Sequence, residues 1–195
     1  MYHFRVKSTN SLNASSSSGD YTFITLSPIT LTIISPLDGA TINRSDVMVK
    51  GTVTNTTGNE TGVTVNGIVA TTYGNQFVAN HISLIDGTNT ITANATDTAG
   101  NTASATITVN AVTTGNYIQL TANSESAISP LEVTLKIDGS FSITNSTITY
   151  TGPAQPEFLF SSADEYRVRM TVEGIYYFTA SVTGPDSNVY QDTVA

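Results

Sequence analysis

The side chains that enzymes use for acid–base and nucleophilic chemistry are scarce in this sequence. It contains two histidines, His3 and His81, and no cysteine. The histidines are far apart along the chain, and we expect both side chains to be solvated and to take no part in catalysis or metal binding. The lack of cysteine excludes disulfides, thiolate catalysis, zinc knuckles and haem attachment.

Carboxylates and hydroxyls form no recognisable catalytic pattern either. The nearest carboxylate pair is Asp164-Glu165, and adjacent residues on a strand face opposite ways. A glycosidase needs two carboxyl groups held across a cleft. No serine lies in the strand-to-helix turn of a nucleophile elbow. We therefore predict that the protein is not an enzyme.

Asp97 and Asn101 are the one pair that suggests a cofactor, which would be calcium. The segment Asp97-Thr98-Ala99-Gly100-Asn101 offers side-chain and carbonyl oxygens, the ligands that calcium prefers. The same residues are typical of a tight turn, in which aspartate bonds to nearby backbone and glycine takes a positive φ. Calcium needs about six to eight oxygens, and the sequence places far fewer here. A structural turn is thus the alternative interpretation.

Asparagine in the pattern Asn-x-Ser/Thr is the acceptor for N-glycosylation in exported proteins of organisms that carry out this modification. The matches are Asn13, Asn43, Asn55, Asn59, Asn94 and Asn145. Chance matches are frequent in a chain this rich in serine and threonine. Asn94 falls on the expected outer face of a strand, where a glycan has room.

The composition limits the partners and favours β-structure. The 195 residues carry a net charge of −8 and only 11% charged side chains. Because there is no basic patch, nucleic acid and anionic membranes are disfavoured. No stretch approaches the ~20 apolar residues of a membrane span. The N-terminus does not read as a signal peptide, and we expect a segment of a longer extracellular or cell-surface protein.

Alternation of apolar and polar residues is clearest in the segment 87–109. Apolar residues recur at every second position on both sides of the turn at 97–101, and these residues are Ile91, Ala93, Ala95, Ala103, Ala105, Ile107 and Val109. A period of two is the signature of strands with one buried and one solvent-exposed face. The segment therefore predicts an antiparallel pair of strands joined by a tight turn.

Residues 28–111 read as one complete β-sandwich of about seven short strands. Asn66-Gly67 predicts a two-residue hairpin turn, and Gly51 in a strand predicts the close approach of a neighbour. The alternation changes phase near Asn80-His81, which predicts a bulge. The segment includes the runs ITLTIISPLDGATI, VTVNGIVA and ITANATDTAGNTASATITV. With these runs it resembles a bacterial immunoglobulin-like module of the type appended to glucodextranase. This resemblance implies a spacer or accessory module without catalytic chemistry.

Residues 112–116 read as a linker, and residues 117–195 as a second sandwich. Alternating apolar residues predict three strands in it, over 131–137, 166–172 and 176–182. Phe158 and Phe160 alternate with Leu159, and we expect them in the core. The run TVEGIYYFTASVT resembles the late strands of a divergent polycystic-kidney-disease-type repeat, which implies a sandwich.

Residues 1–27 read as two strands without a domain of their own. The segment YHFRVKSTN resembles the penultimate strand of a fibronectin type III domain, and the resemblance implies that Tyr2 is the corner tyrosine of that family. A second short strand is expected at 21–25. Since an isolated hairpin is only marginally stable in water, we expect the remnant of an upstream domain. The alternative is that these strands join the sheets of the next module.

The predicted fold class is all-β, with tandem immunoglobulin-like β-sandwiches. We predict a non-catalytic spacer or adhesion segment of a large cell-surface or secreted prokaryotic protein, with other domains of the same polypeptide as partners. The first alternative is a filament subunit assembled with neighbouring subunits by strand addition. The second is an accessory module that binds surface glycans through exposed aromatic residues, for which the candidates are Phe158, Phe160, Tyr177 and Tyr190.

Overall fold

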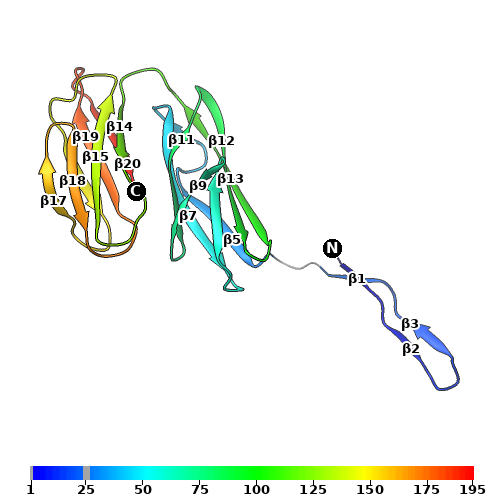
Figure 1. Cartoon of the computed structure of the whole chain (residues 1–195). Coiled ribbons are helices and arrows are strands. Elements are labelled where there is room, and N and C mark those ends of the chain that lie inside the picture. The colour runs from blue at the N-terminus through cyan, green and yellow to red at the C-terminus, as the bar shows by residue number, and fades with distance from the viewer. Residues whose placement is uncertain (1, 24–26) are drawn as a thin grey trace.

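The computed structural model of the chain describes residues 2–23 and 27–195, and every regular element in these ranges is a β-strand (Figure 1). Two sandwiches lie next to each other, and their strands span residues 29–111 and 118–194. The predicted class, tandem immunoglobulin-like sandwiches, is confirmed. Within the described ranges there is no helix with the length and apolar character needed to cross a membrane.

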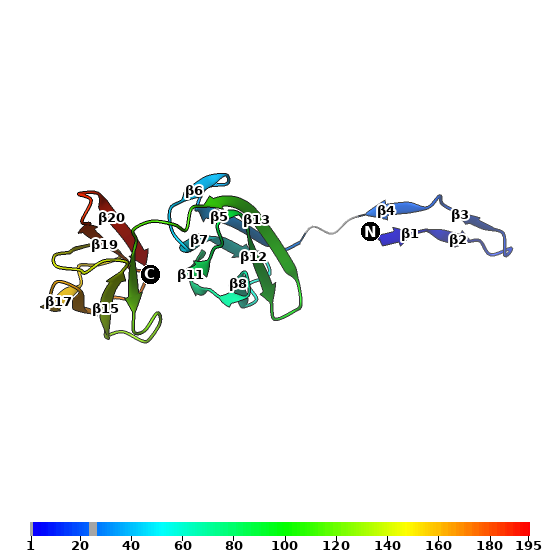
Figure 2. The ribbon, with the colours of Figure 1, turned by 90° about the horizontal axis from the view of Figure 1, so that it is seen from above.

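The N-terminal strands form a ribbon. β1 (Tyr2–Phe4) pairs with β4 (Tyr21–Phe23), and β2 (Lys7–Thr9) pairs with β3 (Ser15–Ser17), all antiparallel. Neither pair includes a strand of the sandwiches, and Figures 1 and 2 show the ribbon standing apart from them. The alternative in which these strands join the next module is therefore wrong. The expected role of the Tyr2 side chain, and residues 24–25 of the expected second strand, lie outside the described residues.

Nine strands make the first sandwich. They are β5 (Ile29–Ser35), β6 (Ala40–Ile42), β7 (Asp46–Asn55), β8 (Thr61–Val65), β9 (Ile68–Val69), β10 (Thr71–Tyr73), β11 (Gln76–Ser83), β12 (Gly87–Asp97) and β13 (Thr102–Ala111). One sheet has the order β10-β11-β7-β5 and the other β6-β13-β12-β8-β9. β12 and β13 pair antiparallel over ten residue pairs, as the alternation in 87–109 predicts.

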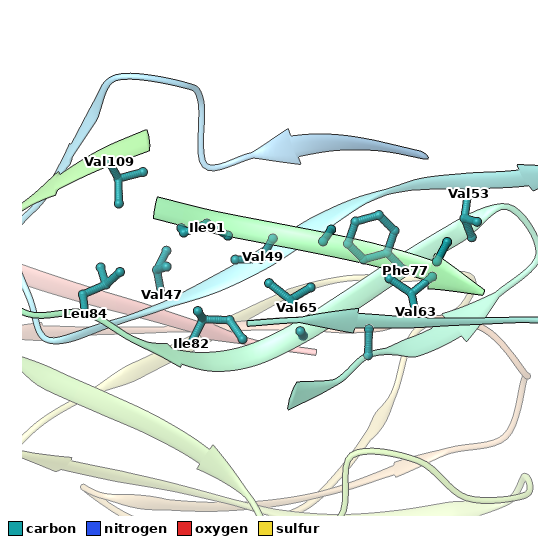
Figure 3. Packing of buried hydrophobic residues seen from close by; sticks show 14 of the residues in the cluster. Val47, Val49, Val53, Val63, Val65, Phe77, Ile82, Leu84, Ile91 and Val109 are labelled. Carbon is teal, nitrogen blue, oxygen red and sulfur yellow. The ribbon is translucent and has the colours of Figure 1, made fainter. Parts of the chain in front are cut away.

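The core of the first sandwich comes from the inward positions of both sheets (Figure 3). Ile91, Ala93 and Ala95 of β12 are fully buried, which confirms the predicted face. Phe77, also fully buried, lies against Gly51 of β7. A Cβ at Gly51 would be 2.0 Å from the carbonyl oxygen of Thr32 and 2.5 Å from Cε1 of Phe77. Only glycine fits at this position, so the predicted close approach is confirmed.

Two local features of the first sandwich follow from backbone conformation. Asn66 and Gly67 have φ of 46° and 87° between β8 and β9, as the predicted hairpin turn requires. In β11 the register to β7 shifts between Ala79 and Ile82, and His81 has φ of 52°. This is the predicted bulge. It turns the His81 side chain away from the regular alternation of the strand.

Seven strands make the second sandwich. They are β14 (Ile118–Ala122), β15 (Leu131–Gly139), β16 (Thr147–Thr151), β17 (Glu157–Ser161), β18 (Glu165–Met170), β19 (Tyr177–Thr183) and β20 (Val189–Val194). The sheets have the orders β14-β15-β18-β17 and β16-β19-β20. The core is lined by the predicted alternating residues of β15, β18 and β19, among them Leu135, Val168 and Phe178.

Two expectations for the second sandwich are wrong. Phe158 and Phe160 are 42% and 40% exposed, because β17 is an edge strand that pairs only with β18. A bulge between them places Phe158 opposite Val168 but Phe160 opposite Arg167, so the two rings do not share one face. Val172 is exposed as well. It follows the end of β18 at Met170, so the alternation no longer directs it inward.

Candidate functional site: the joint between the sandwiches

The two sandwiches meet through a cluster of polar side chains, which we call the joint: Arg44, Asp46, Asn80 and His81 from the first sandwich, and Gln119 and Asp192 from the second. Arg44 lies between β6 and β7. Its guanidinium donates hydrogen bonds to the carboxylate of Asp192 and, at 3.3 Å, to the carbonyl of Gln191. Asp192 is 3% exposed. Its other oxygen accepts the N–H of Leu120 at 2.7 Å.

His81 forms the second part of the joint, together with Asp46 and Gln119. Its Nδ1 lies 2.7 Å from Oδ2 of Asp46, and the amide of Gln119 donates to the same oxygen at 3.1 Å. Nε2 of His81 is buried without a hydrogen-bond partner in the described part of the chain. The expectation of a solvated His81 is therefore wrong, because the bulge in β11 directs the ring into the joint. His3 is exposed, as expected, beside Asp20.

Two further contacts close the joint. The Asn80 amide donates to the carbonyl of Ala195 at 2.8 Å and accepts the Ala195 N–H at 3.1 Å. The ammonium of Lys50 lies 4.8 Å from the centre of the Tyr177 ring. Asn80 is itself buried, so these hydrogen bonds satisfy an amide that would otherwise lose its contacts with water. The C-terminal end of the described chain accordingly lies between the sandwiches (Figure 1).

The electrostatics of the joint favour a charged Asp46–His81 pair. Burial opposes the ionisation of Asp46, but hydrogen bonds from His81 and Gln119 and the charge of Arg44 outweigh it and lower the pKa of this carboxyl. The hydrogen bond to Asp46 raises the pKa of His81. Burial raises the pKa of Asp192, more than the nearby Arg44 charge lowers it. Arg44 is thus the cation that compensates the buried carboxylate of Asp192.

The Asp97 turn lies away from the joint, at the end of β12. One carboxylate oxygen accepts the N–H groups of Ala99 and Asn101 at 3.0 and 2.8 Å. The other accepts the side-chain amides of Asn101 and Asn55 at 2.9 and 3.0 Å. Hydrogen bonding, chiefly from the Asn101 side chain, lowers the pKa of Asp97 to about 2. The alternative of a structural turn thus accounts for all these contacts, and calcium binding by Asp97 and Asn101 stays a prediction.

Among the described residues there is no group of three or more histidine, aspartate or glutamate side chains placed to hold a metal ion. A cation at Asp97 would need Asn101 to turn its amide oxygen toward it, whereas the amide nitrogen faces Asp97 here.

The six candidate glycosylation sites differ in accessibility. Asn13, Asn43, Asn94 and Asn145 are exposed, whereas Asn55 and Asn59 are half-buried. The side-chain nitrogen of Asn55 donates to Asp97 at 3.0 Å and to Thr61 at 3.1 Å. A glycan on this nitrogen would displace these contacts. Glycosylation stays a prediction, and the exposed sites fit it better.

The aromatic candidates for sugar binding do not come together. Phe158 and Phe160 lie on the edge strand β17, on the side of the second sandwich that faces away from the first (Figure 1). Tyr177 lies at the joint, where the ammonium of Lys50 lies over its ring. Tyr190, on β20, packs against Phe141 with ring centres 5.4 Å apart. The four rings therefore do not form a single platform for a sugar.

Sequence reasoning missed Arg44, Asp46, Gln119 and Asp192. The one signal available for them is parity. Asp192 lies two positions before Val194 on β20, and both are buried. A carboxylate on the inward face of a strand indicates a buried partner, but alternation does not say which cation supplies it.

Comparison with known proteins agrees with this architecture. Residues 29–113 match the family described as glucodextranase, domain B, so the first sandwich is similar to that domain. The match covers less than half of the chain. No curated protein is significantly similar to the sequence.

Solved structures of multi-domain β-proteins are similar to the chain at low identity. The fibronectin(III)-like modules of Clostridium thermocellum CbhA are 15% identical, with 84% of this chain and 91% of that chain covered and a TM-score of 0.31. Cadherin domains 1–4 of protocadherin gamma B7 are 11% identical, with 100% and 64% covered and a TM-score of 0.30. A chimeric titin Z1Z2 tandem is 13% identical, with 84% and 96% covered and a TM-score of 0.32.

Proposed function

We propose that this chain is a non-catalytic structural segment that holds two sandwiches at a fixed angle within a larger extracellular or cell-surface protein. The observation that carries the proposal is the joint, where Arg44 pairs with buried Asp192 and His81 and Gln119 share Asp46. Such contacts have to break before one sandwich rotates against the other. The match of the first sandwich to glucodextranase domain B supports a domain that accompanies others in one polypeptide.

The connector between the sandwiches is also restrained at both ends. The N–H of Val112 donates to the carbonyl of Ile42 at 2.8 Å, and the N–H of Thr113 to Asp86 at 3.1 Å. At the other end, the N–H of Tyr117 donates to the hydroxyl of Ser140 at 3.0 Å. Only residues 114–116 lie between these anchors. Because so short a segment has little reach, the connector and the joint together favour a rigid pair.

The chain's lack of cysteine makes a direct distance measurement simple. Cysteines introduced at Val69 and Val189, which are 79% and 64% exposed, accept a spin label each without competition from native thiols. We expect the full chain to give one narrow distribution of label-to-label distances by pulsed electron spin resonance. A distribution spread over tens of ångströms would mean that the sandwiches move independently, and the proposal would be abandoned.

Adhesion through the edge strand β17 is a second candidate function. The specific observation is that Phe158, Leu159 and Phe160 are all exposed there, and the ring of Phe158 lies 6.4 Å from that of Tyr150. Exposed aromatic faces suit sugar rings, and an apolar edge strand suits strand addition by a neighbouring subunit. A glycan array with the full chain and its Phe158→Ala variant tests sugar binding. Electron micrographs of the purified chain, by showing particles or filaments, test strand addition.

A further inference from the structure

A cavity of about 310 Å³ opens between the first sandwich and one end of the second. Its floor consists of core side chains of the second sandwich, including Leu135, Met170 and Phe178. Strand β10 of the first sandwich and the loop 123–130 of the second line its sides. Pockets for small molecules are mostly apolar and measure roughly 300–1,000 Å³. The cavity therefore has the size and the apolar floor of a site for a small ligand.

Apolar side chains exposed to solvent surround the mouth of the cavity. Tyr73, Ile128 and Val172 all line it, and they are 51%, 87% and 45% exposed. They come from β10, from the loop 123–130 and from the segment after β18. An apolar group held between them would remove this surface from water, which is favourable in proportion to the area covered. The mouth thus selects an occupant with an apolar body.

The charged side chains around the cavity determine which sign of charge a ligand should carry. Among the described residues that line it, Glu125 and Glu173 have the only charged side chains, and none of these residues is a lysine, arginine or histidine. Both glutamates are exposed. Neither of them is in an ion pair within 4.0 Å in the described part of the chain. Two carboxylates at one mouth attract a cation and repel an anion.

We propose that this cavity binds a small amphiphilic cation, with its alkyl or aromatic body against the apolar walls and its positive head between Glu125 and Glu173. Both sandwiches line the cavity, so the bound molecule contacts both sides of the joint. It therefore also favours the closed arrangement, in which the contacts of the joint are formed, over an open one in which they are broken, since a ligand stabilises the state that binds it better.

Primary n-alkylammonium ions from butyl to heptyl are suitable probes. Their binding to the full chain is followed by NMR shifts of the amides of residues 124–129 and 171–176. We expect the affinity to rise by about fourfold with each methylene that the cavity covers. Octanoate has the same seven-carbon alkyl chain and the opposite charge, and we expect it to bind about tenfold more weakly at low salt. Binding without dependence on chain length, or equal binding of the two probes, would overturn the proposal.

Matched variants separate the apolar walls from the charged mouth. Val172→Phe fills the mouth and should weaken heptylammonium binding by about tenfold or more, whereas Val69→Phe, on exposed β9 outside the cavity, should leave it unchanged. The double variant Glu125→Gln/Glu173→Gln should remove the preference for heptylammonium over octanoate. Glu60→Gln, an exposed carboxylate outside this cavity, should keep it. Unchanged binding in Val172→Phe places the probe elsewhere and rejects the site.

Discussion

Replacing Arg44 by alanine removes the cation that faces a buried carboxylate. The side chain of Asp192 is only 2% exposed and that of Arg44 18%. Removing one partner of a buried ion pair costs about 3–5 kcal/mol, since the other charge stays buried and uncompensated. Asp192 keeps hydrogen bonds from the N–H groups of Leu120 and Thr193, so we expect the low end of that range, about 3 kcal/mol.

The sandwiches themselves need not unfold in this variant, because opening the joint returns Asp192 to water. The loss should therefore appear as a fall in the ratio of closed to open joint, on the order of 100-fold at pH 7 for about 3 kcal/mol. With spin labels at positions 69 and 189, we expect Arg44→Ala to broaden the distance distribution. The melting temperature of each sandwich should change much less.

Two matched variants make this prediction sharp. In Arg44→Ala/Asp192→Asn the carboxylate becomes a neutral amide whose oxygen still accepts the Leu120 N–H, so most of the closed population should return. Arg169→Ala removes an exposed arginine that pairs with Glu132 and Glu157 on the second sandwich, and the distribution should stay narrow. If Arg44→Ala keeps the distribution of the unmodified chain, or if Asp192→Asn fails to restore it, the reasoning about the joint is refuted.

Three further predictions concern pH, packing and calcium. Because the pKa of His81 is raised, its contribution to the stability of the joint is complete below about pH 6.5 and is lost as the pH rises through its folded pKa. Because the pKa of Asp46 is lowered, its contribution is lost only when the pH falls through its folded pKa, below 3.8. The distribution of label-to-label distances should therefore be narrowest between about pH 4 and 6.5, and a joint that loosens on acidification from pH 8 to 6 would contradict this. Gly51→Ala should destabilise the first sandwich by about 1–3 kcal/mol in chemical denaturation because its Cβ has no space, whereas Gly62→Ala, with no atom within 4 Å of the new Cβ, should change the free energy of unfolding far less. Millimolar calcium should leave the melting temperature unchanged, since the oxygens of Asp97 already accept four hydrogen bonds, and a rise in melting temperature would establish the calcium site.

Local patterns in the sequence predicted most of the sandwich fold. The alternation at Ile91, Ala93 and Ala95 specifies a buried face, and Asn66-Gly67 specifies a turn. The change of phase before Ile82 specifies the bulge in β11. These features depend on neighbouring residues only, so a single sequence contains the information for them.

The joint and the edge strand could not be predicted in this way. Arg44 and Asp192 are 148 residues apart, and no local pattern links an arginine before β7 to a carboxylate on β20. The exposure of Phe158 and Phe160 depends on β17 lying at the edge of its sheet, which alternation does not encode. Such features follow from how sheets and sandwiches are placed against each other.

The central claim, that the two sandwiches form one rigid body, is tested most directly by residual dipolar couplings on the full unmodified chain. Backbone N–H couplings of residues 29–111 and 118–194 each determine an alignment tensor. Our account predicts tensors of the same magnitude and orientation when both are expressed in the frame of this structure. Tensors that differ in magnitude would show that the sandwiches reorient independently. Tensors of equal magnitude but different orientation would show a fixed angle other than the one in this structure, and either result would contradict the account.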